Sequence, residues 1–217
     1  MKYAIYDFDG TLLQTQTVPF ILRHWKKLNL TPKPYQKLYR QIIVRYLLVK
    51  SKLFGLKYDH FRYWSMGKVG QLFSGVSMEV LSHFFDSLYQ EASAFLHKKV
   101  IKHIQKDKEE GYQTVLLSGN FDVFLERFRP LGFDFIIGTP LYNLEGKIPA
   151  TIMMLSADQK IPNLLNAFKD LQWSETKAYT DSYADIQLLN QVKHPICVTP
   201  DKRLIAHAKA NQWRIIS

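Results

Sequence analysis

The chain has 217 residues, of which 47% are hydrophobic and 14% aromatic, a composition typical of a globular protein. Its single cysteine, Cys197, excludes an internal disulfide, and no apolar run approaches the roughly 20 residues that span a bilayer. Because the N-terminus also lacks a leader-like apolar segment, we expect a soluble, cytoplasmic protein.

The net charge of +10 is concentrated in one early part of the chain. Residues 23–68 contain twelve Lys or Arg side chains and one acid, Asp59, whereas the remaining residues contain seventeen basic and eighteen acidic side chains. Whatever binds this segment is therefore expected to be anionic.

The chain opens with an apolar run that ends in two carboxylates, Asp7 and Asp9, followed by Gly10 and Thr11. The run predicts a strand, and side chains two residues apart in a strand lie on the same face. Ligands of open α/β sheets bind at such strand ends. An Asp-Gly pair is also an ordinary turn signal, so the pattern needs partners elsewhere in the chain.

Residues 15–97 show no alternation of strands and helices, and their apolar residues recur at three- and four-residue spacing over 35–53 and 78–95, which predicts helices. From residue 98 onward, strands are predicted at 113–117, 133–137, 177–180, 196–199 and 213–216, with helices between them and a β-hairpin over 141–152. This alternation predicts a Rossmann-like, mainly parallel sheet with helices on both faces.

The predicted organisation is therefore an α/β core domain, residues 1–14 and 98–217, interrupted by a helical cap domain, residues 15–97. Because the insertion follows the first strand, we expect the cap to lie over the C-terminal edge of the sheet, above Asp7 and Asp9.

Polar motifs follow three later predicted strands. Ser118-Gly119-Asn120 offers a hydroxyl and backbone N–H groups suited to an anion, although such residues also cap helices. Lys160 lies near the start of a helix, where a lysine is ordinarily solvated. Asp181 and Asp185 lie at a strand-to-helix junction, where the spacing from Ser182 to Asp185 also resembles a capping box. Each motif alone is weak, and their order at successive strand ends strengthens all of them.

Taken together, the DxDGT box at Asp7 to Thr11, Ser118, Lys160 and the DSxxD box at Asp181 to Asp185 resemble the haloacid dehalogenase-like superfamily of phosphohydrolases. The Gly138-Thr139 step and the ending Val198-Thr199-Pro200-Asp201 are similar to its phosphoserine-phosphatase-like branch, of subfamily IB type. The resemblance covers the whole chain and implies a phosphatase.

The resemblance implies a role for each site residue. Asp7 would be the nucleophile that forms an aspartyl-phosphate, and Asp9 would protonate the leaving group and then deprotonate water. Mg²⁺ would be held by Asp7, Asp181 and the Asp9 carbonyl, in keeping with its preference for oxygen ligands. Of the remaining expected site residues, one group would bind the phosphoryl oxygens (Ser118, Gly119, Asn120, Lys160). The other would contact and orient the residues that bind substrate or metal (Asp185, Thr11).

The substrate is less well defined. Phosphoserine phosphatases of this branch usually have DFDST as the first box and a glutamate early in the cap. This chain has Gly10, and Gln14 to Thr17 in the corresponding region, with no acid before Asp59. We therefore predict a small anionic phosphorylated metabolite rather than an amino-acid phosphate.

Two alternatives remain open. One is a phospholipid-type phosphatase, such as a phosphatidylglycerophosphate phosphatase, whose apolar stretch 42–49, flanked by Lys37, Arg40, Lys50 and Lys52, contacts an anionic membrane peripherally. An ordinary cap helix with a solvated basic rim explains the same stretch. The other is a non-catalytic nucleic-acid-binding protein. This is disfavoured because a binding module has no need of Asp7, Asp9, Lys160 and Asp181 together.

Overall fold

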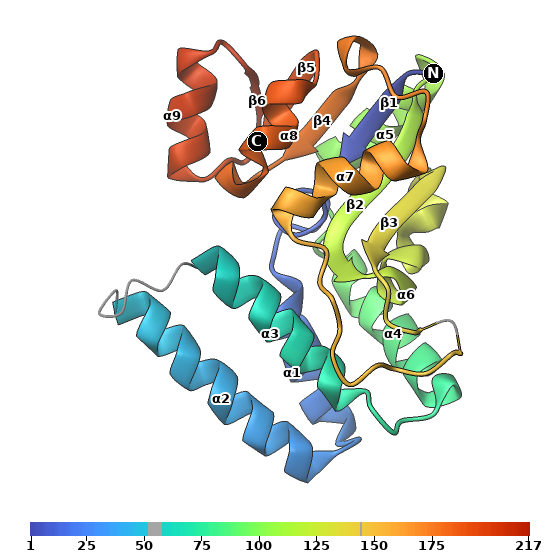
Figure 1. Ribbon diagram of the computed structural model, residues 1–217, viewed down its shortest axis with the longest axis vertical. Coiled ribbons are helices and arrows are strands. Elements are labelled where there is room, and N and C mark those ends of the chain that lie inside the picture. The colour runs from blue at the N-terminus through green and yellow to red at the C-terminus, as the bar shows by residue number, and fades with distance from the viewer. Residues whose placement is uncertain (52–57, 144) are drawn as a thin grey trace.

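The computed structural model describes residues 1–51, 58–143 and 145–217 and contains a six-stranded parallel sheet (Figure 1). The strand order is β3-β2-β1-β4-β5-β6. Their bounds are Tyr3–Tyr6 (β1), Gln113–Phe121 (β2), Phe135–Thr139 (β3), Lys177–Thr180 (β4), His194–Val198 (β5) and Arg214–Ile216 (β6). The order reverses at β1, which pairs with β2 on one side and β4 on the other. Ligand sites of open α/β sheets lie at such a reversal, outside the carboxyl ends of the strands.

Helices cover both faces of this sheet. One face packs against α5 (Lys98–Glu109), α6 (Asp122–Leu125) and a 3₁₀ helix (Glu126–Leu131), with Tyr6 and Leu116 facing Ile104 and Phe128 in a single cluster. The other face packs against α7 (Ala157–Ala167), α8 (Ile186–Gln191) and α9 (Lys202–Ala210). The central strands β1, β2 and β4 are mostly buried on both sides, whereas the edge strands β3 and β6 are partly exposed. The predicted Rossmann-like α/β fold is confirmed.

Between β1 and α5, the described residues form four helices, which we call the helical insert. They are α1 (Thr17–Leu28), α2 (Pro32–Ser51), α3 (Tyr58–Leu72) and α4 (Met78–Ser93). Trp25 of α1 is fully buried, with its ring 5.2 Å from that of Phe73 and 5.1 Å from that of Phe84. In Figure 1, α2 forms the outer edge of the insert, on the far side of α3 from the sheet.

Several predicted elements differ from the observed ones. The β-hairpin over 141–152 is wrong, since the described residues of that stretch contain no strand. They turn at Asn143, whose N–H donates to the Lys147 carbonyl over 2.8 Å, and Leu141 and Ile152 pack individually into the core. The strand predicted over 113–117 is longer than expected, because β2 continues through a bulge to Phe121, which pairs with Thr139.

The remaining boundaries agree within a few residues. The predicted helix over 35–53 is α2, and its last two residues lie outside the described part of the chain. No helix among the described residues has both the length and the apolar character needed to cross a bilayer.

Candidate active site

The carboxyl ends of β1 and β4 bring the two acidic boxes together. Asp7 directly follows β1, and its N–H donates to the Tyr179 carbonyl of β4 over 2.9 Å. Gly10 then turns the chain with a φ of +83°, which is unfavourable for residues with a side chain. A Cβ at Gly10 would lie 2.1 Å from Oδ2 of Asp181, so only glycine lets the first loop and the Asp181 carboxylate approach this closely.

Lys160 bridges two carboxylates in the interior. Its Nζ donates to Oδ1 of Asp7 and to Oδ2 of Asp185, each over 2.8 Å. Thr180 donates its hydroxyl to the same Asp185 oxygen over 2.7 Å, which fixes that side chain. Burial disfavours the lysine charge, but Asp185 and Asp7 outweigh burial and raise the pKa of Lys160 above its ordinary value. The site therefore contains a permanent cation against Asp7.

Asp9 lies in the loop that follows β1 and faces the first residue of α1. Its Oδ1 accepts hydrogen bonds from the backbone N–H of Thr17, over 2.8 Å, and from the Thr17 hydroxyl. The amide of Asn120 donates to that hydroxyl over 2.7 Å. Burial raises the pKa of Asp9 to about 6, although Arg62 and Thr17 act in the opposite direction. A carboxyl group with this pKa can release and regain a proton near neutral pH, as general acid–base catalysis requires.

The environment of Asp181 disfavours the ionised form of its carboxyl group. Thr11 donates its hydroxyl to Oδ1 of Asp181 over 3.4 Å. Burial and, next to it, the charge of Asp7 raise the pKa of Asp181 to about 8, while Arg62 opposes the shift. Burial also raises the pKa of Asp7, against the attraction of Lys160. The cluster is therefore short of positive charge.

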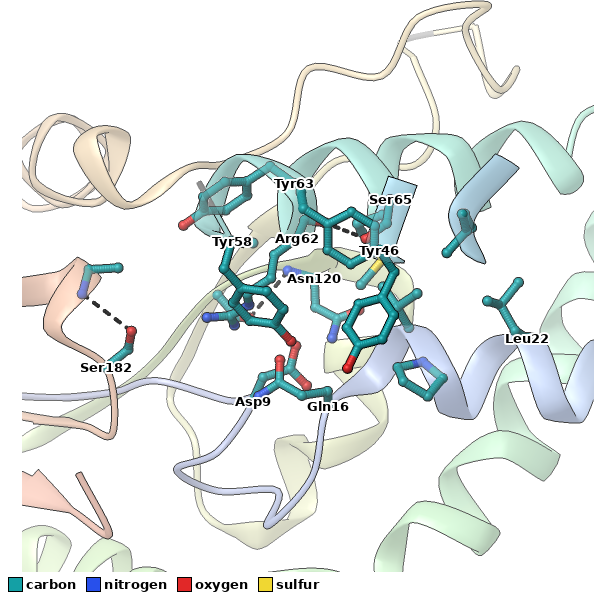
Figure 2. A pocket seen from close by; sticks show the side chains of 18 of the residues that line it. Asp9, Gln16, Leu22, Tyr46, Tyr58, Arg62, Tyr63, Ser65, Asn120 and Ser182 are labelled. Carbon is teal, nitrogen blue, oxygen red and sulfur yellow. Dashed lines mark hydrogen bonds between the residues drawn. The ribbon is translucent and has the colours of Figure 1, made fainter. Parts of the chain in front are cut away.

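Arg62 of α3 is the residue that sequence reasoning missed. It faces the carboxylates from the helical insert, and Figure 2 shows it above Asp9 and beside Asn120. Burial disfavours its charge, but Asp9, Asp7 and Asp181 together raise the pKa of Arg62 above its ordinary value. Nothing in the sequence separates it from the other basic residues of segment 23–68. Thr17 was likewise missed as a partner of Asp9, because nothing in the neighbouring sequence distinguishes it.

The carboxylate arrangement suits Mg²⁺. Among the described residues, no group of three or more His, Cys, Asp or Glu side chains is arranged to hold a metal ion by itself. Mg²⁺ does not need one, because it commonly retains waters and takes only one or two protein carboxylates. Burial raises the pKa of both Asp7 and Asp181, with the charge of Asp185 adding to the shift of Asp7 and the charge of Asp7 to that of Asp181, so the two provide oxygen donors whose charge a divalent cation would neutralise.

The Ser118-Gly119-Asn120 motif lies within β2 rather than before a helix. Ser118 is buried, and its Oγ accepts the Asn120 N–H over 3.2 Å. A Cβ at Gly119 would lie 2.7 Å from the Leu155 carbonyl oxygen and 3.1 Å from the Tyr63 ring, so the position requires glycine. The Asn120 amide donates to the Thr17 hydroxyl, and the Ser118 hydroxyl is a further side-chain donor of this motif that lines the cavity.

A cavity of about 540 Å³ lies above these groups, between the sheet edge and helices α1 to α3 (Figure 2). Seven predicted site residues line its floor, whereas Thr11 and Asp181 do not: Asp7, Asp9, Ser118, Gly119, Asn120, Lys160 and Asp185. Its walls combine apolar residues of the insert (Val18, Leu22, Ile42, Ile43, Phe61, Met66) with tyrosines (Tyr35, Tyr39, Tyr46, Tyr58, Tyr63) and cations (Arg23, Lys26, Arg62). None of the described residues that the insert contributes to this lining is acidic.

Comparisons with known proteins agree with this geometry. The family model for haloacid dehalogenase-like hydrolase matches residues 4–190, which include all four motifs. No curated protein matches the chain significantly. A protein of unknown function from Bordetella pertussis Tohama I has a similar structure, with a TM-score of 0.81 at 18% identity, covering 100% of this chain and 98% of that one.

Two phosphoserine phosphatase structures are also similar. The apo form has a TM-score of 0.64 at 16% identity, covering 99% of this chain and 92% of that chain. A substrate-bound complex has a TM-score of 0.61 at 18% identity, with 100% and 93% covered. At these identities the similarity is one of fold.

Proposed function

Because the chain belongs to the haloacid dehalogenase-like hydrolase family, we propose that it is a Mg²⁺-dependent phosphatase that acts through an aspartyl-phosphate intermediate. The observation that carries the proposal is the bridge from Lys160 to Asp7 and Asp185, with each hydrogen bond 2.8 Å long. A buried cation fixed against one carboxylate oxygen is what an anionic nucleophile needs to approach an anionic phosphoryl group.

In the first step, the Asp7 carboxylate attacks phosphorus while the ester P–O bond breaks. Lys160 holds Oδ1 of Asp7, which leaves Oδ2 for the attack. Lys160 and Arg62 surround the phosphoryl oxygens with positive charge, and Ser118 donates its hydroxyl to one of them. Mg²⁺, held by Asp7, Asp181 and the Asp9 carbonyl, would supply further charge neutralisation and orient the phosphoryl group.

Asp9 carries the proton. In its neutral form it donates the proton to the leaving alkoxide, and as a carboxylate it then takes a proton from the water that attacks phosphorus and breaks the bond to Asp7. The pKa of about 6 makes both forms accessible near neutral pH. The two hydrogen bonds from Thr17 keep Oδ1 in place, so the other oxygen of Asp9 is the one that exchanges the proton.

We further propose that residues 15–97 act as the cap domain on a core of residues 1–14 and 98–217. The absence of acids among the described residues of the insert that line the cavity supports an anionic metabolite as substrate. An ammonium group would lack a carboxylate partner there, whereas Arg23 and Lys26 offer charge for a second anionic group. Cytoplasmic location remains part of this proposal.

A second candidate is a phospholipid-type phosphatase. The specific observation in its favour is the apolar wall of the cavity, to which Leu22, Ile42 and Phe61 contribute. A small charged metabolite gains little from such a wall, whereas the apolar part of an amphiphilic phosphomonoester would be buried against it. Such substrates reside in bilayers, so this candidate also requires peripheral contact of the cap with an anionic membrane.

A test of the proposed chemistry is hydrolysis of a generic aryl phosphate with and without Mg²⁺. We expect Mg²⁺-dependent turnover that Asp7→Asn abolishes. Asp86→Asn is the matched control, because Asp86 is exposed and its ion-pair partner in the described part of the chain is Arg127, away from the cavity. Absence of turnover by the wild-type enzyme, or undiminished turnover by Asp7→Asn, would contradict the proposal.

A panel of glycerol-, sugar-, amino-acid- and lipid-phosphates separates the two substrate classes. Preference for a small anionic ester supports the first candidate, and preference for a lipid phosphate supports the second. A preference for amino-acid phosphates would contradict both, since their ammonium group has no acidic partner among the described residues of the insert that line the cavity.

A further inference from the structure

The outer side of α2 is exposed and largely aliphatic. Of its 20 residues, Tyr35, Leu38, Ile42 and Val49 are buried against the rest of the insert. The opposite side exposes Ile43, Val44, Leu47 and Leu48, which we call the aliphatic strip. Val44 and Leu47 are 57% and 55% exposed, and the four residues are neighbours on the helix rather than isolated apolar residues on the surface.

Cations without acidic partners surround this strip. Lys37, Arg40 and Lys50 lie on the same helix and are exposed, and none forms an ion pair with any residue that the structure describes. The sequence has no Asp or Glu from residue 10 to residue 58. Lys52, which also flanks the helix in sequence, lies outside the described residues. The surface therefore combines exposed apolar side chains with a positive charge that nothing on it neutralises.

The aliphatic strip continues onto α3 through a shallow groove. Val44 and Leu48 line this groove together with Arg45, Trp64 and Lys68. The guanidinium of Arg45 lies 4.4 Å from the centre of the Trp64 ring, a cation–π contact that joins α2 to α3 beside the strip. Tryptophan, arginine and lysine, each with an apolar body and a polar end, are side chains favoured at the boundary between water and lipid.

We propose that the aliphatic strip docks on the surface of an anionic lipid bilayer. Aliphatic side chains gain from the acyl boundary, and the surrounding lysines and arginines gain from the lipid phosphates. A second copy of the chain fits less well, because two such cationic surfaces would repel each other. Nucleic acid fits less well because exposed Ile, Val and Leu side chains neither stack on bases nor bind phosphates.

The mouth of the active-site cavity lies next to this surface. Ile43 belongs to the aliphatic strip and also lines the cavity. Tyr39 and Tyr46 line the cavity from the same helix and are partly exposed, and Figure 2 shows Tyr46 on the same side of the pocket as Gln16. Docking would therefore place the cavity entrance at the lipid surface. The docking itself depends on the surface alone and not on the proposed chemistry.

The test is co-sedimentation of the full chain with two kinds of vesicle, phosphatidylcholine alone and equal parts of phosphatidylcholine and phosphatidylglycerol. We expect binding to the anionic vesicles only, weakened by high salt. Val44→Asp with Leu47→Asp should lower the partition coefficient by at least about tenfold. The matched control is Met153→Asp with Leu165→Asp, because these apolar residues are also exposed, 80% and 45%, but lie outside the aliphatic strip. This double variant should bind the vesicles as the wild type does.

Charge reversal provides a second, independent pair of variants. Lys37→Glu with Arg40→Glu should lower binding by at least about tenfold. Lys202→Glu with Lys209→Glu changes the net charge equally on α9, away from α2, and should have little effect. Asp7→Asn should bind as the wild type does, so that failure of the chemistry and failure of docking are distinguishable.

Three results would overturn the proposal. The first is no binding to anionic vesicles at low salt, and the second is equal binding by both members of either variant pair. The third is a concentration-dependent dimer, or binding to an oligonucleotide, that Val44→Asp with Leu47→Asp abolishes while vesicle binding persists. Circular dichroism and thermal unfolding should show that the variants fold, as expected for substitutions at exposed positions.

Discussion

Replacing Asp181 by Asn should stabilise the metal-free protein. In its folded environment the Asp181 carboxyl has a pKa of about 8 rather than 3.8, because it is buried and faces Asp7. The folded state therefore binds a proton more tightly than the unfolded state, and ionisation at neutral pH destabilises the fold. Asn has nearly the shape of the neutral acid and carries no charge, so the substitution removes this repulsion.

The magnitude follows from the pKa difference. Each pKa unit corresponds to about 1.4 kcal/mol, so the shift amounts to about 4 kcal/mol at pH 7, and the partial solvent access of Asp181 reduces the expected gain to about 2–4 kcal/mol. The gain should be near zero at pH 4, grow as the pH rises, and level off above pH 8. Mg²⁺ should reduce this difference, because it should stabilise the wild type by about 2.7 kcal/mol at a hundred times its dissociation constant and leave the variant unchanged.

Urea unfolding of both proteins between pH 4 and pH 9, with EDTA or with Mg²⁺, measures these quantities. The control is Asp134→Asn, because hydrogen bonds from Lys108 and Thr114 lower the pKa of Asp134 against the effect of burial. Its carboxylate stabilises the fold above the ordinary pKa, so that substitution should destabilise the protein at pH 7 and have less effect as the pH falls. A destabilised, metal-free Asp181→Asn at pH 7, or a gain independent of pH, would refute the reasoning.

Three further predictions follow from the same contacts. Lys160→Met should destabilise the protein by about 3–5 kcal/mol in urea unfolding at pH 7, because Asp7 and Asp185 lose their shared cation; a cost below 1 kcal/mol, as for an exposed pair, would contradict the buried bridge. Gly10→Ala should lower Mg²⁺-dependent turnover by at least about tenfold, since its Cβ would meet Asp181. Gly111→Ala shares the positive φ but has open space at its Cβ, so it should cost only about 1–2 kcal/mol of stability and leave turnover unchanged. Thr17→Val removes a hydrogen bond that lowers the pKa of Asp9, so the alkaline limb of the pH profile of kcat/KM should move to higher pH; an unmoved limb would exclude Asp9 as the proton donor.

The meeting of the polar motifs at one edge of the sheet was predictable, because the parallel sheet fixes where its strands end. A parallel sheet brings the carboxyl ends of β1, β2 and β4 to one edge, so motifs far apart in sequence necessarily meet there. Both the family and the fold predicted from Asp7, Ser118, Lys160 and the Asp181 box are confirmed. The individual roles of these residues remain predictions.

The contribution of the insert was not predictable. Arg62 reaches the carboxylates only because α3 packs against α1 in one orientation, and that orientation depends on side-chain packing that no local pattern encodes. The predicted hairpin failed because apolar residues such as Leu141 and Ile152 are buried one at a time in a loop and mimic the alternation of strands. Nor did the sequence show that β2 bulges and continues to Phe121, a register feature set by its pairing with β3.

The hydrogen bonds around Thr17 have a consequence for the timing of the reaction. Thr17 is the first residue of α1, so the groups that stabilise the Asp9 carboxylate move with the insert and not with the sheet. A motion that lifts α1 away from β1 removes both hydrogen bonds, which lower the pKa of Asp9, and also lessens the burial that raises it. The proton affinity of Asp9 is thus tied to the position of the insert, so the step in which Asp9 gives up its proton depends on where α1 lies.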